Sequence, residues 1–329
     1  MGAGVVMSAQ GAASLLGVLL SLVLAPLVPG IINRVKAKMG GRRGRPMLQL
    51  YFDIAKLMRK APVYPHGSTV FFCLAGPAGV AGGILALLVL PLGALGAPLS
   101  FAGDFILLAG AFALARFTLI LAALDTGSAF EGMGAAREAL FSALAEPVFL
   151  FCLLLLSYHM QQYSLADMLT GGITVTTVRM DWVFYLMIIC ALFLLLLPEN
   201  SRIPVDDPNT HLELTMIHEV MILDHSGPDL ALLEYAASLK LWIFSLLIAG
   251  VLIPAGQGAP AFDIAGAWTG QGPGSLLGSV GLHLLVIFCI AVLIGLVESL
   301  MARFRMERVP QVFTLAGALA CLAAVVIWR

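Results

Sequence analysis

The chain has 329 residues, of which 60% are apolar and only 11% are charged, and its mean hydropathy is +0.99. This composition argues against a water-soluble domain, and nucleic-acid binding by the basic connection after the first span is not expected. The net charge of −1 says little about partners, because the charges are segregated by connection. The five cysteines lie in or beside apolar runs and show no CxxC spacing, which predicts buried thiols and no metal or iron–sulfur centre in this chain.

Eight apolar segments approach or exceed the roughly 20 residues that cross a bilayer. They predict an all-α polytopic membrane protein that forms a single integral membrane domain over residues 1–329. The predicted spans are 11–32, 69–92, 101–123, 139–158, 180–197, 232–253, 277–298 and 309–328. The predicted cytoplasmic connections are about 33–68, 124–138, 198–231 and 299–308.

Basic residues follow the first, third, fifth and seventh spans, whereas the other connections hold only Arg179. The positive-inside rule therefore places the odd-to-even connections in the cytoplasm and both termini outside. The first connection ends in LQLYFDIAKLMRK, which is amphipathic at helical period. Such a helix lies at a membrane surface or packs under a partner.

The chain is organised around a polar connection at 199–234. Between Asp206 and His225 it holds five carboxylates and three histidines, spaced seven residues apart. A capping box at Thr210-x-x-Glu213 predicts a short helix over 211–223. The histidine spacing does not match a zinc helix, which favours hydrogen-bonding or proton-relay roles over metal binding.

Glu219 interrupts an apolar stripe of that predicted helix, formed by Leu212, Met216 and Leu223. A carboxylate in protein interior must be paired, hydrated or protonated. The alternative is a surface helix with a glutamate that reaches out to solvent.

Two spans carry ionisable residues at depth. Arg116 lies in the third span, and Glu146 lies beside Pro147 in the fourth. A glutamate next to a proline-disrupted helix is predicted to bind a proton or to pair with Arg116, and a purely structural ion pair is the alternative. Glu234 and Glu298 are predicted at the same cytoplasmic level.

The segments NRVKAKMGGRRGRPMLQLYFDIAKLMRK, ENSRIPVDDP, HSGPDLALLEYA and MARFRMERVP, with the Glu146-Pro147 pair, resemble the respiratory complex I subunit 1 family over nearly the whole chain. DTGSAFEGMGAARE and NTHLELTMIHEVMILDHSGPD resemble the branch found in energy-converting (group 4) [NiFe] hydrogenases and formate hydrogenlyase. The chain departs from the complex I branch at residues 210–213 and 218–219, which weakens the case for a quinone reaction.

The resemblance implies eight spans in a prokaryotic inner membrane and a non-catalytic subunit of an oxidoreductase complex. The implied partners are the hydrogenase large and small subunits, a ferredoxin-like iron–sulfur subunit, antiporter-like membrane subunits and membrane lipid. The [NiFe] centre and the iron–sulfur clusters would belong to the partners.

Electron transfer in a docked arm would then shift carboxylate pKa values and drive movement of H⁺ or Na⁺. The candidate coupling residues are Glu138, Glu146, Glu199, Asp206, Glu213, His218, Glu219, Asp224, Glu234 and Glu298. The candidate partner-docking residues are Arg34, Arg42, Arg43, Arg45, Arg202, Asp207, Arg303 and Arg305.

Two other functions remain open from the sequence. One is the quinone-site subunit of a complex I-like oxidoreductase, and the other is a stand-alone ion transporter. The sequence leaves open the electron donor, the ion carried and the number of companion membrane subunits.

Overall fold

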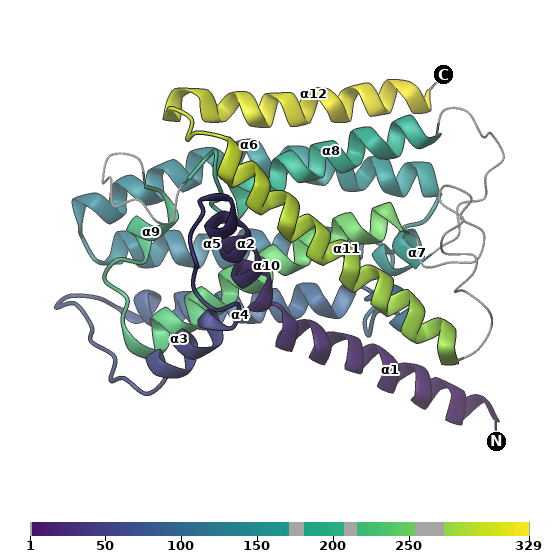
Figure 1. Ribbon diagram of the computed structural model, residues 1–329, viewed down its shortest axis with the longest axis horizontal. Coiled ribbons are helices and arrows are strands. Elements are labelled where there is room, and N and C mark those ends of the chain that lie inside the picture. The colour runs from purple at the N-terminus through teal and green to yellow at the C-terminus, as the bar shows by residue number, and fades with distance from the viewer. Residues whose placement is uncertain (1, 171–180, 207–215, 254–272, 329) are drawn as a thin grey trace.

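The computed structural model describes residues 2–170, 181–206, 216–253 and 273–328. The fold is all-α, and eight segments of the described chain are long and apolar enough to cross a membrane. The chain is a multi-pass membrane protein. Figure 1 shows that α1 begins and α12 ends at one end of the bundle, whereas α3 and α9 lie at the other. The latter is called the charged end below.

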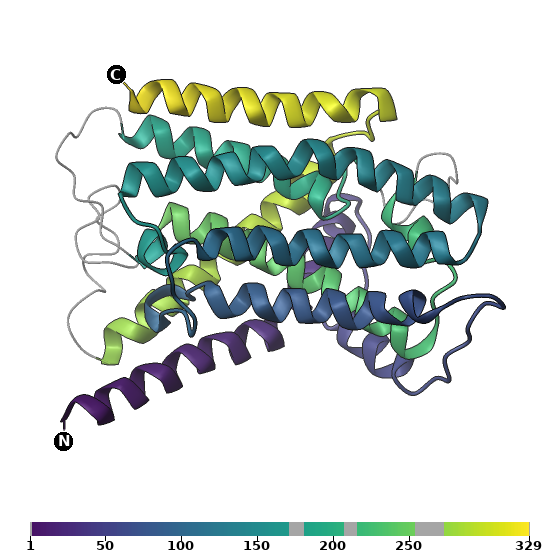
Figure 2. The ribbon, with the colours of Figure 1, turned by 180° about the vertical axis from the view of Figure 1, so that it is seen from behind.

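The helices are named in chain order, and the bundle is seen from behind in Figure 2. They are α1 (Gly2–Leu24), α2 (Leu27–Met39), α3 (Gln49–Leu57), α4 (Val70–Val89), α5 (Asp104–Asp125), α6 (Ala129–Met160), α7 (Leu165–Thr170), α8 (Asp181–Glu199), α9 (His218–Met221), α10 (Gly227–Leu252), α11 (Pro273–Leu300) and α12 (Val309–Ile327), with 3₁₀ turns at Gly93–Leu95 and Met306–Arg308.

The first predicted span is two helices, because the chain turns at Ala25 and Pro26 between α1 and α2. A helix end leaves backbone carbonyls without partners, which is costly in apolar surroundings. Two tyrosine hydroxyls bond to such carbonyls here. Tyr51 of α3 donates to Val23, and Tyr235 of α10 donates to Leu22 at 2.9 Å.

The fourth span begins at Ala129, ten residues before its predicted start at 139, so the connection before it is shorter than predicted. The helix continues through its glycines, and at Gly134 it lies against the segment before α9. A Cβ on Gly134 would lie 3.0 Å from the Ile217 carbonyl oxygen. The helix therefore needs a small residue at this contact.

The predicted helix over 211–223 is wrong in its described part. Only His218–Met221 is helical, and Met216 and Ile217 precede it in non-helical conformation. The amides of Ile217 and His218 donate to the Asp206 carboxylate at 3.1 and 3.3 Å. Since a side chain outside the helix accepts these donors, the capping position lies seven residues later than predicted.

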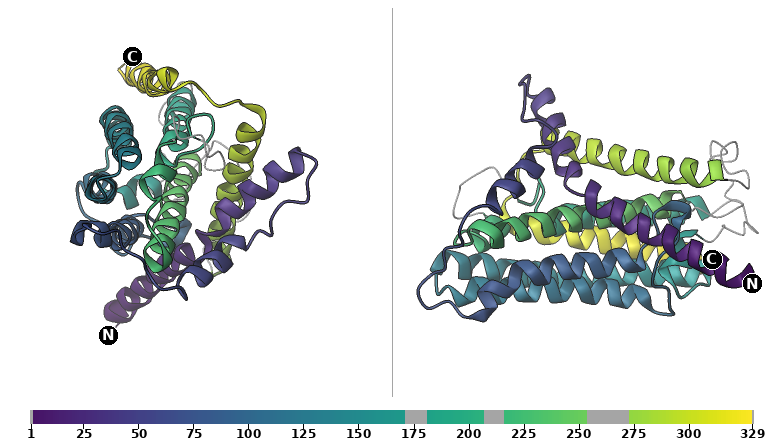
Figure 3. Two further views of the ribbon diagram at one scale, coloured as in Figure 1. Left: turned by 90° about the vertical axis from the view of Figure 1, so that its left-hand side faces the viewer. Right: turned by 90° about the horizontal axis from the view of Figure 1, so that it is seen from below.

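Helix α10 is the centre of the bundle, and its side chains from Ser238 to Phe244 are almost all buried. Figure 3, seen along the bundle in its left-hand view, shows other helices around it. Helix α4 approaches it through glycines: a Cβ on Gly79 would lie 2.9 Å from the Ala236 Cβ. Such small residues allow two membrane helices to pack backbone to backbone.

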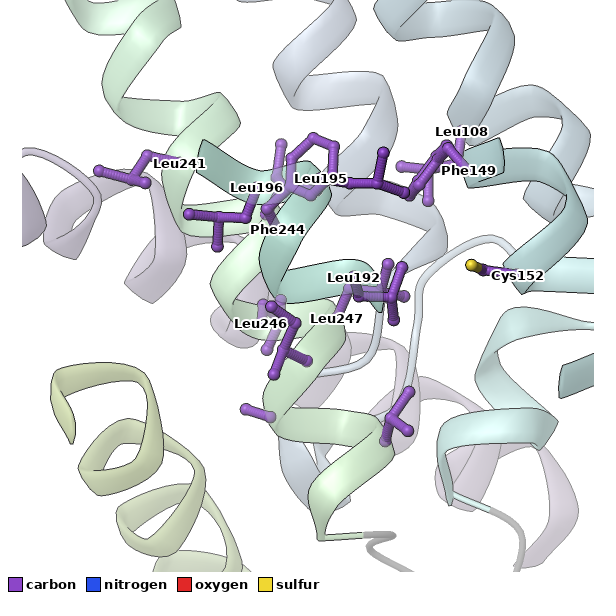
Figure 4. Close-up of a cluster of buried hydrophobic side chains, with 14 of the residues drawn as sticks. Leu108, Phe149, Cys152, Leu192, Leu195, Leu196, Leu241, Phe244, Leu246 and Leu247 are labelled. Atoms are coloured by element: carbon purple, nitrogen blue, oxygen red, sulfur yellow. The ribbon is translucent and has the colours of Figure 1, made fainter. Parts of the chain in front are cut away.

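Buried apolar side chains fill the middle of the bundle (Figure 4). The phenyl ring of Phe244 lies 5.4 Å from that of Phe112 and 5.2 Å from that of Phe149, measured between ring centroids. We call this group the apolar layer; it comprises Leu108, Phe112, Phe149, Leu192, Leu195, Phe244 and Leu247, all buried.

Candidate functional site

Arg116 of α5 binds three carboxylates at once. Its guanidinium nitrogens lie 2.6 Å from Glu146, 2.5 Å from Glu199 and 3.2 Å from Glu138. Glu138 and Glu146 project from the same side of α6 because they lie about two turns apart. A buried arginine requires such partners. The structure confirms the expected Arg116–Glu146 pair and adds Glu138 and Glu199 as further partners of Arg116.

Lys240 of α10 extends this group. Its ammonium lies 2.7 Å from the same oxygen of Glu199 that Arg116 contacts. The cluster thus joins three acids to two bases, drawn from four helices: α5, α6, α8 and α10. Its formal charge is −1 when every acid is ionised, so one proton or one added charge changes its balance.

A second cluster surrounds Glu298 at the charged end of α11. Its side chain is fully buried and lies 2.8 Å from Lys36 of α2 and 3.7 Å from Arg202. Helices α2 and α11 meet closely here, since a Cβ on Gly295 would lie 2.8 Å from the Val35 Cβ. This cluster joins α2, α11 and the segment after α8.

Asp206 organises the segment that enters α9. One carboxylate oxygen accepts the two backbone amides described above, and the other accepts a hydrogen bond from Arg303 at 3.0 Å. Asp206 is 1% exposed. Its bonds to the amides of Ile217 and His218 therefore fix the positions of His218 and Glu219 at the start of α9.

A cavity of about 370 Å³ lies between α2, α3, α4, α5, α10 and the segment after α8. Its apolar wall is formed by Leu50, Ile54 and Leu233. Phe112 lines the cavity and also belongs to the apolar layer, so the cavity meets the layer at this residue. Its polar lining comprises Asn33, Arg45, Gln49, Asp53, Arg116, Glu138, Glu199, Asn200, Ser201, Arg202, His218, Glu219, Glu234, Ser238 and Lys240.

Glu219 and His218 face this cavity with shifted proton affinities. Burial, together with the nearby charges of Glu234 and Asp206, raises the pKa of Glu219 to about 7. Burial lowers the pKa of the His218 imidazole. Near neutral pH, Glu219 is therefore poised to gain or lose a proton while His218 is neutral.

Comparison with known proteins identifies the fold. The sequence model of the family described as NADH dehydrogenase matches residues 12–328. The chain belongs to this family. The family is of the complex I subunit 1 type.

Two relatives come from Escherichia coli (strain K12). Hydrogenase-4 component C is 32% identical over 310 residues, which cover 92% of this chain and 91% of that protein. Formate hydrogenlyase subunit 4 is 30% identical over 321 residues, which cover 94% of this chain and 96% of that one.

A solved structure shares the fold. It is the membrane-bound sulfane sulfur reductase (MBS), an archaeal respiratory membrane complex, of which one chain superposes with a TM-score of 0.78. The alignment covers 96% of this chain and 99% of that one at 18% sequence identity. The likeness therefore supports the helical architecture of this family member.

The structure brings many of the predicted coupling residues together. Five line the cavity directly: Glu138, Glu199, His218, Glu219 and Glu234. Glu146 and Asp206 join them through Arg116 and through the α9 amides, and Glu298 lies in the neighbouring cluster. Glu213 lies outside the described residues.

Two members of the polar connection lie apart from the cavity. Asp224 is exposed, and its backbone amide donates to buried Glu131. The His225 ring stacks on Phe72 with centroids 3.9 Å apart, and burial lowers its pKa to about 4. His218 lines the cavity and His225 does not, so these two histidines do not share one site, and His211 lies outside the described residues.

The predicted docking residues divide into two groups. Arg34, Arg42, Arg43, Arg45 and Arg305 are exposed. Arg202 and Arg303 instead pair internally with Glu298 and Asp206. Asp207 lies outside the described residues.

Sequence reasoning missed two partners in the clusters, Lys36 and Lys240. The signal for Lys240 was present, because it is the only lysine or arginine between Asp229 and Leu252 of α10. A charged residue inside an apolar span is a functional candidate by default. The described residues contain no group of His, Cys, Asp or Glu that could hold a metal ion.

Proposed function

We propose that this protein is the membrane anchor and coupling subunit of an energy-converting [NiFe] hydrogenase complex. It would link proton reduction in a docked hydrogenase arm to movement of H⁺ or Na⁺. Two full-length relatives are named as parts of hydrogenase-4 and formate hydrogenlyase, which supports this role. The observation that carries it is a charged cavity linked to a buried ionic cluster and closed on one side by the apolar layer.

The route of coupling begins at Glu219. A change of charge in the docked arm would alter its protonation, since its pKa lies near neutrality. Glu234, Glu199 and Glu138 line the same cavity. Interacting acids titrate as a group, so one proton gained at Glu219 would redistribute protons among the others.

The route would leave this chain through the side of the helix bundle, toward a neighbouring membrane subunit. The apolar layer blocks a direct path along α10 to the opposite end. Glu146, by contrast, has a side chain that is 41% exposed while it still contacts Arg116. A companion antiporter-like membrane subunit with a polar group at this depth would receive the proton or ion.

The charged end would face the cytoplasm under the positive-inside rule. The exposed Arg34, Arg42, Arg43 and Arg45 would dock the hydrogenase large and small subunits and a ferredoxin-like iron–sulfur protein. Planar guanidinium groups bind carboxylates well, which suits an acidic partner surface. The [NiFe] centre and iron–sulfur clusters would lie in those partners.

The proposal is tested with Glu146→Gln in the assembled complex. The complex would be reconstituted in liposomes, and hydrogen evolution and ion uptake would be measured together. We expect hydrogen evolution to persist and ion uptake to be abolished, because glutamine keeps the size of the side chain and cannot carry a proton. The matched control is Glu307→Gln, which removes an exposed carboxylate outside both clusters.

Full ion uptake by Glu146→Gln would refute the coupling assignment.

Co-purification addresses the anchor role separately. Mass spectrometry of the tagged protein, purified gently in detergent, should find [NiFe] hydrogenase subunits together with hydrogen evolution. A chain that purified alone and transported ions would favour a transporter.

A quinone-site subunit is the second candidate, because the cavity has an apolar wall on α3 and α10 opposite polar groups. Cavities of this size and mixed lining accommodate small organic ligands. Quinone reduction by the purified complex, lost on Leu50→Trp or Leu233→Trp, would favour this candidate.

A further inference from the structure

Helix α3 presents two different faces. Gln49, Asp53 and Ile54 line the cavity. On the other side, Leu48 just before the helix is 49% exposed and Phe52 is 60% exposed. These two residues are four positions apart and so share one face.

The exposed side of α3 is also basic. Lys56 in its last turn and Arg59 and Lys60 just beyond it are exposed. The acid in this helix, Asp53, faces the cavity side, where its carboxylate accepts a hydrogen bond from Gln49 at 2.8 Å. The outer face therefore combines a large apolar side chain with positive charge and carries no opposing acid.

The contacts of α3 set its depth in the bundle. Tyr51 donates its hydroxyl to Val23, in the last turn of α1. Its inner side shares the cavity wall with Leu230 and Leu233, in the first turns of α10. Since α10 begins at the charged end, helix α3 lies at the level where this membrane-spanning helix begins, which is near the lipid headgroups.

We propose that the outer face of α3 binds the anionic surface of the adjacent bilayer leaflet. Phe52 and Leu48 would insert among the acyl chains near the headgroups. Lys56, Arg59 and Lys60 would bind lipid phosphates, as basic amphipathic helices do at membrane interfaces. The bilayer would then support the outer wall of the cavity.

A protein partner could instead cover this face, and the first experiment separates the two. Phe52→benzoylphenylalanine is introduced in the full chain, and native membranes are illuminated before purification. Leu315→benzoylphenylalanine, on the exposed side of α12, is the control for a membrane-embedded position. We expect lipid adducts at both positions. Adducts to another protein at Phe52, or none there, would overturn the proposal.

The second experiment tests the charge. The triple variant Lys56→Gln, Arg59→Gln and Lys60→Gln is compared with Arg34→Gln, Arg42→Gln and Arg43→Gln, which removes the same number of exposed charges elsewhere. Each full chain is placed in nanodiscs of mixed anionic and zwitterionic phospholipid, and retained lipid is measured after detergent extraction. We expect enrichment of anionic lipid to fall by about fivefold or more in the α3 variant alone. Equal enrichment in the two variants would overturn the proposal.

Discussion

Arg116 and Glu199 form an ion pair of 2.5 Å between α5 and α8, with only 6% of either side chain exposed. Removing one partner of a buried pair leaves a charge that neither water nor protein compensates. The pair therefore holds two membrane helices together and at the same time makes the site sensitive to any change of charge.

Replacing Arg116 should strongly destabilise the fold. Arg116→Leu leaves Glu138 and Glu146 without their cation and leaves Glu199 with Lys240 alone. We expect the free energy of unfolding to fall by about 3–5 kcal/mol, measured by denaturant titration of the full chain in detergent. Arg305→Leu, at an exposed position, should change it by less than about 0.5 kcal/mol. Equal stability of the two variants would contradict this prediction.

Gly30 should tolerate no side chain. A Cβ there would lie 1.9 Å from the Met47 carbonyl oxygen, which is backbone and cannot move aside cheaply. Gly30→Ala should therefore separate α2 from the segment leading into α3, and lower the melting temperature of the protein. Gly110→Ala is the control, because nothing lies within 4 Å of its Cβ and alanine is the better helix former. A melting temperature of Gly30→Ala at or above that of Gly110→Ala would be incompatible with this packing.

The pKa of Glu219 predicts a pH dependence of stability. The folded state raises it to about 7 from 4.5, so between these values the folded protein retains a proton that the unfolded chain has lost. The contribution of Glu219 to the free energy of unfolding therefore falls as pH rises from 4.5 to 7, and then stays constant.

Glu219→Gln removes this dependence. The stability of the variant relative to the unmodified protein should increase across the same pH interval, as measured by melting temperature at a series of pH values. Glu307→Gln should follow the unmodified protein at every pH. Parallel curves for Glu219→Gln and the unmodified protein would show that Glu219 titrates normally.

Asp206 should control the order of α9. Asp206→Asn keeps one acceptor but turns an amide donor toward Arg303, which is itself a donor. We expect faster hydrogen exchange at the amides of Ile217 and His218, because a buried hydrogen-bond network is weakened by about 1–3 kcal/mol. Asp224→Asn, in the same connection but exposed, should leave that exchange unchanged. Unchanged exchange in Asp206→Asn would contradict the role assigned to it.

The membrane spans could be predicted from the sequence because hydropathy reports on them directly. The partnership of Arg116 with Glu146 followed from depth in the membrane. The convergence of Glu199 and Lys240 on the same site did not, because it depends on how α8 and α10 pack around α5. The start of α9 was misplaced for the same reason: its capping acceptor, Asp206, is eleven residues before Ile217.

The apolar layer also determines where the membrane voltage acts. An electrical potential falls mainly across regions of low dielectric constant, and falls little across a polar cavity that opens to one side. Glu219 and Glu234 lie on the cavity side of Phe112 and Phe244. The protonation of Glu219 should therefore follow the pH of the adjoining compartment and respond little to voltage, so that most of the electrical work of moving an ion would be done beyond the cavity.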